Sequence, residues 1–193
     1  MKRKWIPLLC LLLLLSGCGK AERSQLVQER YAAVTSAEMT AETTCHLPAE
    51  SRTFQIHCDY RRDGRSEITV LEPEELSGLK AVVSEEDLSL SYDGLVLPAG
   101  TQASVSAANC LPWLMRAAAG GYVLEEGRES LEETPCLRAA FDTTGDDGQK
   151  VLCTIWFDES TLTPVYGELS REGELILTVR MIQFSAELEE PAA

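Results

Sequence analysis

The chain has 193 residues and a formal net charge of −14, because 31 acidic side chains outnumber 17 basic ones. Such a negative surface repels nucleic acid and anionic head groups, so phosphate-binding classes of protein are disfavoured and no nucleic acid is expected as a partner. The length suits one domain with a sizeable hydrophobic core.

The N-terminus has the pattern of a signal peptide. A basic Lys-Arg-Lys sequence at residues 2–4 precedes an apolar run from Trp5 to Leu15. This run of 11 residues is too short to span a bilayer as a helix, and it fits the apolar region of a signal peptide. Residues 1–17 are therefore assigned as signal peptide, and the chain without them has a formal charge of −17.

The apolar run ends in Leu-Ser-Gly-Cys at residues 15–18, which resembles the lipobox of bacterial lipoproteins. The resemblance implies that Cys18 carries a diacylglyceryl thioether and becomes the mature N-terminus. Two acyl chains anchor a protein stably, whereas one chain holds it only marginally. We therefore expect a protein tethered to the extracytoplasmic face of the cell membrane through lipidated Cys18. The alternative is an ordinary signal peptide that happens to contain a cysteine.

The mature chain divides into a short N-terminal segment and one main domain. Within KAERSQLVQERYAAVTS, residues 20–36, the apolar spacing predicts a short amphipathic helix with one apolar side, formed by Leu26, Val27, Tyr31 and Val34. The lipidated N-terminus and this helix occupy residues 18–36, the main domain spans 37–188, and residues 189–193 form a tail that we expect to be frayed.

From Glu38 onward, apolar and polar residues alternate with the period of β-strands, most clearly in TFQIHCDY and DLSLSYDG. About ten such segments are separated by turn residues every 8–14 residues, which is typical of an antiparallel barrel or sandwich. Two segments predict helix instead: a longer one after Asn109, with Pro112 early and Gly120 late, and a short turn at residues 73–78. The fold class is therefore α+β and mostly β.

The segment CHLPAESRTFQIHC, residues 45–58, contains both histidines of the chain and two cysteines, which suggests a zinc site or a disulfide. If Cys45 faces Cys58 across a hairpin with its turn near residues 48–52, then His46 faces His57. Because neighbouring side chains of a strand point to opposite faces, the thiols and imidazoles cannot converge on one metal ion. No metal site is expected, and a Cys45–Cys58 disulfide is slightly favoured at an extracytoplasmic address.

Reduced, buried thiols remain the alternative to that disulfide. Besides Cys18, the mature chain has an odd number of cysteines, which leaves at least one unpaired: Cys45, Cys58, Cys110, Cys136 and Cys153. No HExxH, GxSxG, CxxC or phosphate-binding glycine loop occurs, and residues 142–153 fail the calcium-loop pattern. We therefore expect neither a cofactor nor an enzymatic activity.

Several hairpin patterns carry a resemblance to a known superfamily. The segment IWFDESTLTPVYGELSREGELI (155–176), with ITVLEPEELSGL (68–79) and SLSYDGLVL (89–97), resembles the LolA/LolB-like lipoprotein carriers. With the lipobox, the chain is most similar to LolA-like lipoproteins of Gram-positive spore formers, the GerS-like germination lipoproteins. The resemblance implies an incompletely closed antiparallel β-barrel, capped by a few short helices and curved around a hydrophobic cavity.

Two functions follow from this resemblance. The first is a membrane-anchored, non-catalytic protein that binds a lipid or acyl chain in its half-barrel. The second is an interaction scaffold in sporulation or germination that partners a cell-wall (cortex) hydrolase. The apolar residues that would line a cavity would equally form a packed core, and the sequence leaves that choice open; they are Phe54, Ile56, Tyr60, Leu90, Tyr92, Trp113 and Leu114.

Overall fold

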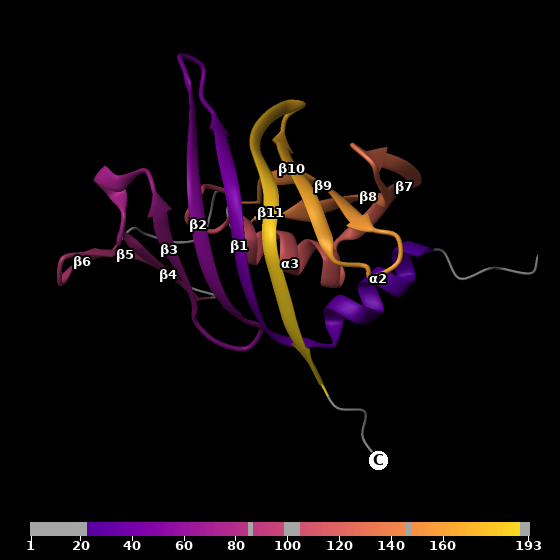
Figure 1. Cartoon of the computed structure of the whole chain (residues 1–193), viewed down its shortest axis with the longest axis horizontal. Helices are drawn as coiled ribbons and strands as arrows, with labels where there is room; N and C mark the ends of the chain where they lie inside the picture. Colours follow the sequence, from indigo (N-terminus) through magenta and orange to yellow (C-terminus); the bar gives the residue numbers. More distant parts are fainter. Residues whose placement is uncertain (1–22, 85–86, 99–104, 146–147, 190–193) are drawn as a thin grey trace, which may run out of the picture.

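The computed structural model describes residues 23–84, 87–98, 105–145 and 148–189. Cys18, the predicted signal peptide and residues 190–193 of the predicted tail lie outside the described residues. Within the described part, the chain forms one 11-stranded antiparallel sheet and two α-helices (Figure 1). Neither α-helix of this part has the length and apolar character needed to cross a membrane.

The elements follow the predicted alternation closely, with a few short connections. The first part contains α2 (Arg23–Ala32), β1 (Val34–His46), β2 (Ser51–Arg61), β3 (Ser66–Glu72), the 3-10 helix η1 (Glu74–Leu76), β4 (Lys80–Val83), β5 (Leu88–Tyr92) and β6 (Leu95–Pro98). The second part contains α3 (Cys110–Gly120), β7 (Tyr122–Leu131), β8 (Thr134–Thr144), β9 (Lys150–Asp158), β10 (Pro164–Arg171) and β11 (Glu174–Leu188).

The strand order shows that the barrel is open. The strands run in the order β6-β5-β4-β3-β2-β1-β11-β10-β9-β8-β7, and each neighbouring pair is antiparallel. Pairing of β1 with β11 joins the beginning and the end of the domain, whereas β6 and β7 form the two edges and do not pair with each other. The predicted fold class, an incompletely closed antiparallel barrel with a few short helices, is therefore confirmed.

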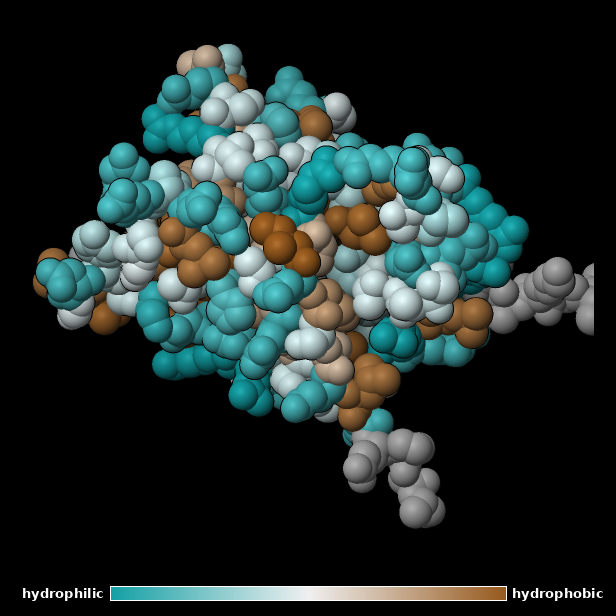
Figure 2. All heavy atoms as spheres, in the orientation of Figure 1, coloured by the Kyte–Doolittle hydropathy of each residue, from teal (hydrophilic) through white to brown (hydrophobic). Residues whose placement is uncertain are grey.

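Alternation along the strands separates an apolar inner face from a polar outer face. On β1, Met39 and Ala41 are buried on the inner face, whereas Glu38 and Glu42 lie on the more exposed outer face. Helix α3 lies on the inner side, behind β1 and β11 in the view of Figure 1. The face turned to the viewer in Figure 2 is correspondingly mostly hydrophilic, with scattered apolar residues.

Helix α3 was predicted correctly, and its C-terminal end shows why glycine is needed there. Gly121 follows the helix, and its backbone N–H donates to the Ala117 carbonyl oxygen at 2.8 Å. A Cβ atom at Gly121 would lie 2.7 Å from that oxygen and 2.8 Å from Cβ of Phe141 on β8. The absence of a side chain therefore allows the helix end to approach the sheet closely.

Helix α2 ends before the predicted C-terminal end of this helix. It ends at Ala32, because the β-branched residues that follow favour a strand, and Val34 already belongs to β1. Val27 and Tyr31 are buried as predicted, but Leu26 is 47% exposed, so its assignment to the apolar side was wrong. The Tyr31 hydroxyl donates to the Leu162 carbonyl oxygen at 3.0 Å, which attaches α2 to the β9–β10 turn.

The register of the β1–β2 hairpin contradicts the predicted Cys45–Cys58 disulfide. The turn spans Leu47–Glu50, so Cys45 faces Arg52, and Cys58 faces Met39. Met39 and Cys45 are roughly 20 Å apart along β1 at about 3.4 Å per residue, and both cysteines are free thiols. The alternation gave the correct inner face for both thiols, but the turn sets the register, and it is shorter than we expected.

The two histidines are separated by the same change of register. His46 faces Ser51 near the hairpin turn, whereas His57 faces Thr40 farther along the sheet. The His57 Nδ1 atom lies 3.2 Å from the Thr40 Oγ1 atom, and the His46 Nε2 atom lies 3.3 Å from the Thr178 Oγ1 atom. Both imidazoles thus bind threonine hydroxyls of neighbouring strands.

Candidate ligand-binding site on the concave face

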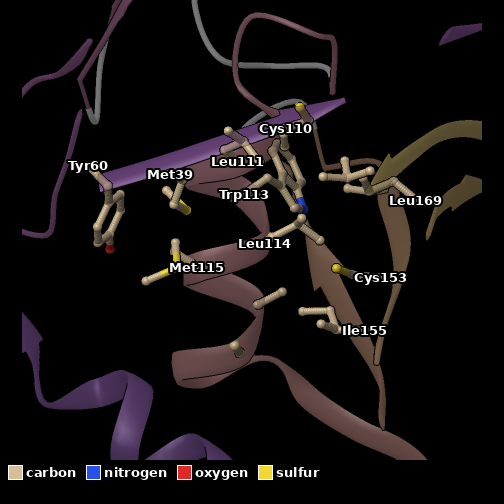
Figure 3. Packing of buried hydrophobic residues seen from close by; sticks show 14 of the residues in the cluster. Met39, Tyr60, Cys110, Leu111, Trp113, Leu114, Met115, Cys153, Ile155 and Leu169 are labelled. Carbon is tan, nitrogen blue, oxygen red and sulfur yellow. The ribbon is translucent and has the colours of Figure 1, made fainter. Parts of the chain in front are cut away.

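Helix α3 occupies the centre of the concave face. Its side chains Leu111, Trp113, Leu114 and Met115 are at most 5% exposed and point toward the sheet (Figure 3). The fit is close at β10, because a Cβ atom at Gly167 would lie 3.0 Å from the Leu114 Cδ2 atom. This part of the predicted cavity is therefore filled by the helix.

Trp113 is fixed by polar contacts at the end of its indole ring. Its Nε1–H donates to the Thr143 Oγ1 atom at 2.9 Å, and the Thr143 hydroxyl in turn donates to the Val151 carbonyl oxygen at 3.0 Å. The Arg116 guanidinium lies 5.4 Å from the ring centroid, within the range of a cation–π contact. Trp113 is thus an anchor of α3 on β8 and β9.

The other predicted lining residues divide into three groups by exposure. Ile56 and Tyr60 are 1% and 7% exposed and belong to the packed core, where burial raises the pKa of the Tyr60 hydroxyl. Phe54 and Leu90 are partly buried and pack against the core from its border. Tyr92 is 49% exposed at the end of β5, so it lies at the rim of the face and not inside it.

An apolar surface that is only partly covered extends over β2–β5, beside the N-terminal end of α3. Leu90 faces Ala81 of β4, and Ala81 faces Ile68 of β3, which places all three on the inner face. The partly buried apolar side chains of these strands are Phe54, Val70, Leu88 and Leu90. Here the concave face keeps apolar area that no helix of the described residues seals.

Two members of this surface, Leu88 and Val70, were not among the lining residues predicted from the sequence. Leu88 alternates with Leu90 in DLSLSYDG, and Val70 is the last residue of the strand pattern SEITV. The period-two alternation could therefore have identified both residues. Two of the predicted aromatic lining residues lie elsewhere: Trp113 at the packed centre and Tyr92 at the rim.

Three hollows on the described surface lie elsewhere and are lined mainly by polar atoms. Two adjoining hollows of about 420 and 430 Å³ follow the outer side of β1, share Glu38 and Ser185, and reach His57 and Asp59. A third, of about 380 Å³, lies between the C-terminal end of α3 and β8. None of these three hollows includes Phe54 or Tyr92, so they are distinct from the apolar surface of β2–β5.

Comparisons with known proteins agree with this architecture. No protein-family model matches the chain, and no curated protein matches its sequence. An uncharacterized conserved protein from Thermus thermophilus is 12% identical with a TM-score of 0.51, and the match covers 88% of this chain and 90% of that chain. This match concerns the fold alone, an open antiparallel sheet with helices on its inner face.

Other similar structures carry superfamily names. A LolA superfamily protein from Nitrosomonas europaea is 14% identical with a TM-score of 0.46, with coverage of 88% of this chain and 94% of that chain. LprF from Mycobacterium bovis is 10% identical with a TM-score of 0.47, with coverage of 88% and 96%. With TM-scores below 0.5, these two likenesses carry no conclusion about this chain, and the narrower relation to spore-former germination lipoproteins stays a prediction.

Proposed function

We propose that the chain is a membrane-anchored, extracytoplasmic binding protein that holds a lipid or acyl chain against the concave face of β2–β5. The observation that carries this proposal is the distribution of burial. Trp113, Leu114 and their neighbours on α3 are sealed, whereas Phe54, Val70 and Leu90 remain partly accessible on the same inner face. Apolar surface that stays open inside a concavity is the usual feature of a site for hydrophobic ligands.

The anchoring part of the proposal depends on the Leu-Ser-Gly-Cys pattern at residues 15–18. Mass spectrometry of the protein isolated from membranes tests it and should find a diacylglyceryl group on an N-terminal Cys18. A secreted chain with an unmodified Cys18 would contradict the anchor and leave the ligand site untouched, because the two parts of the proposal depend on different residues.

Fluorescence quenching by a brominated fatty acid tests the ligand site. In a Trp156→Phe variant lacking the signal peptide, Trp113 of α3 is the remaining tryptophan and reports ligand binding. We expect saturable quenching that Leu90→Gln weakens about tenfold and that Leu124→Gln, at an exposed position of the distant strand β7, leaves unchanged. Absence of saturable quenching, or equal loss in both variants, would reject the site.

A protein-interaction scaffold is the second candidate, and one observation favours it. The β5–β6 hairpin exposes Leu95 by 72% and Val96 by 66%, and large exposed apolar side chains on a projecting hairpin are typical of protein contacts. The named partner, a cell-wall hydrolase of sporulation or germination, depends on the family resemblance alone. A Leu95→Ser, Val96→Ser variant that binds the fatty acid normally but loses a purified partner would establish the scaffold as a separate role.

A further inference from the structure

Helix α2 is bound to the edge strand β7 by hydrogen bonds at two places. The Ser24 backbone N–H donates to the Glu126 Oε2 atom at 2.8 Å, near the start of the helix. One turn later, the Gln28 Nε2 atom donates to the Gly121 carbonyl oxygen at 2.7 Å, next to the first residue of β7. The N-terminal half of α2 therefore lies along this edge of the sheet.

Three large apolar side chains are exposed in the two short segments that these hydrogen bonds delimit. Leu26 is 47% exposed and points away from the sheet, because Ser24 and Val27 occupy the buried side of the helix. On β7, Tyr122 is 73% exposed and Leu124 is 55% exposed. In Figure 1, α2 and β7 lie at one end of the long axis of the molecule. That end thus presents apolar side chains to its surroundings.

Ion pairs offset part of the negative charge at the same end. Glu159 lies 2.7 Å from the Arg23 guanidinium and 3.0 Å from that of Arg128. Glu125 lies 3.2 Å from the Arg138 guanidinium. The repulsion from an anionic surface that is expected of the whole chain is therefore weakened here.

The predicted lipid anchor is attached close to this end. Cys18 precedes Arg23 by five residues, and a chain segment of that length reaches at most about 18 Å. By comparison, the 15 residues of β11 extend over roughly 50 Å at about 3.3 Å per residue. A lipidated Cys18 would therefore keep the start of α2 near the bilayer, whichever way the rest of the domain turns.

We propose that Leu26, Tyr122 and Leu124 form a membrane-docking surface that inserts into the interfacial region of the bilayer carrying the lipidated Cys18. Leucine gains free energy by leaving water, and tyrosine can keep its hydroxyl among the head groups while its ring is buried. This inference rests on the anchor of the proposed function and is independent of the ligand site on β2–β5.

Docking at this surface would leave the opposite end of the molecule accessible. The β5–β6 hairpin lies at the other end of the long axis in Figure 1, and its Leu95 is 72% exposed. One exposed apolar group would thus face the membrane, whereas the other would remain available for a protein contact. The two groups provide matched positions for a test.

Hydroxyl-radical footprinting of the lipidated chain in phosphatidylcholine vesicles tests the docking surface. The vesicles are first floated on a density gradient, and side-chain oxidation is then compared with that of an unlipidated chain that begins at residue 19. Tyr92 and Leu95 serve as internal references from the other end of the molecule. Transfer of one leucine side chain out of water shifts an equilibrium by about tenfold or more, so oxidation of Tyr122 and Leu124 should fall by about threefold or more.

Matched variants separate docking from anchoring. A lipidated Leu26→Gln, Leu124→Gln variant should float with the vesicles as before, but oxidation of Tyr122 should return to its value in the unlipidated chain. Leu95→Gln, at an equally exposed leucine of the distant hairpin, should change neither flotation nor the protection of Tyr122.

The possible failures are distinguishable. Flotation without protection of Tyr122 and Leu124 would overturn the docking surface and leave the anchor in place. Failure to float would overturn the anchor and the docking surface together. Protection in the unlipidated chain that increases with its concentration would show contact between two copies of the chain, and this result would also overturn the proposal.

Discussion

The two halves of the sheet differ in how their inner faces are covered. In β8–β10, the large inner side chains Phe141, Phe157 and Leu169 are 0% exposed, and the Phe157 ring packs against Tyr31 of α2 with ring centroids 5.4 Å apart. In β3–β5, burial decreases from Ile68 at 2% through the partly buried Leu90 to Tyr92 at 49%. The same period-two pattern thus forms a packed core where a helix covers it, and an accessible apolar surface where the helix ends.

The difference suggests that one half of the sheet serves mainly stability and the other half mainly ligand binding. Fully buried side chains contribute most of the free energy of folding, since both transfer from water and close packing favour the folded state. Partly covered side chains contribute less to folding and can gain more when a ligand covers them. We therefore expect substitutions in the packed half to change stability and substitutions in the open half to change binding.

The largest expected effect contrasts Phe141→Ala with Leu90→Ala. Removal of the Phe141 ring, which is 0% exposed, should lower the free energy of unfolding by about 3–5 kcal/mol. Leu90 is only partly buried, so Leu90→Ala should cost about 1 kcal/mol. Urea unfolding followed by circular dichroism measures both changes. Equal losses for the two variants would show that the halves are packed alike.

A pair of adjacent glycines sharpens the comparison within the packed half. Ala in place of Gly121 meets the Ala117 oxygen and the Phe141 Cβ atom, and should lower the free energy of unfolding by about 1–3 kcal/mol. Gly120→Ala meets nothing within 4 Å and should be neutral or slightly stabilising. Thermal unfolding of the two variants in parallel is the measurement, and a cost for Gly120→Ala as large as that for Gly121→Ala would argue against close docking of the helix end.

The smallest expected effect concerns Asp158, at the turn that α2 contacts. Its Oδ1 atom accepts hydrogen bonds from the hydroxyl and backbone N–H groups of Ser160 and Thr161, which lower the carboxyl pKa to about 2. Because the pKa is lower in the folded state, this stabilisation is present above about pH 4 and is lost as the pH falls toward about 2. Asp158→Asn should weaken the pH dependence of the free energy of unfolding in that window. An unchanged pH dependence would exclude a stabilising role of the Asp158 carboxylate.

Much of the fold could be predicted from the sequence, because period-two alternation and turn residues are local signals. The α3 segment was equally clear from Pro112 and Gly120. The register of β1 against β2 could not be predicted in this way. Moving one strand along the other by an even number of residues keeps the alternation, and the turn that fixes the register has no strong sequence pattern. Leu26 was assigned to the buried side of its helix for a related reason. An apolar side chain on a helix is buried only where neighbouring elements cover it.

The candidate site was harder to predict than the fold. Leucine and aromatic residues on an inner face have the same pattern whether a helix or a ligand covers them. Trp113 and Leu90 were therefore grouped together, although α3 itself contributes Trp113 and leaves Leu90 partly uncovered. Only the length and position of α3 against the sheet decide which residues stay accessible, and that is a property of tertiary packing.

Photo-crosslinking tests the central claim most directly. A fatty acid with a diazirine near its terminal carbon, bound at increasing concentration and then irradiated, should label peptides from β2–β5 in a saturable manner, at Phe54, Val70, Leu88 or Leu90. An excess of unlabelled fatty acid should remove this labelling. Saturable labelling confined to the outer face of β1 and β11, or no saturable labelling, would contradict the assignment of the open half of the concave face as the ligand site.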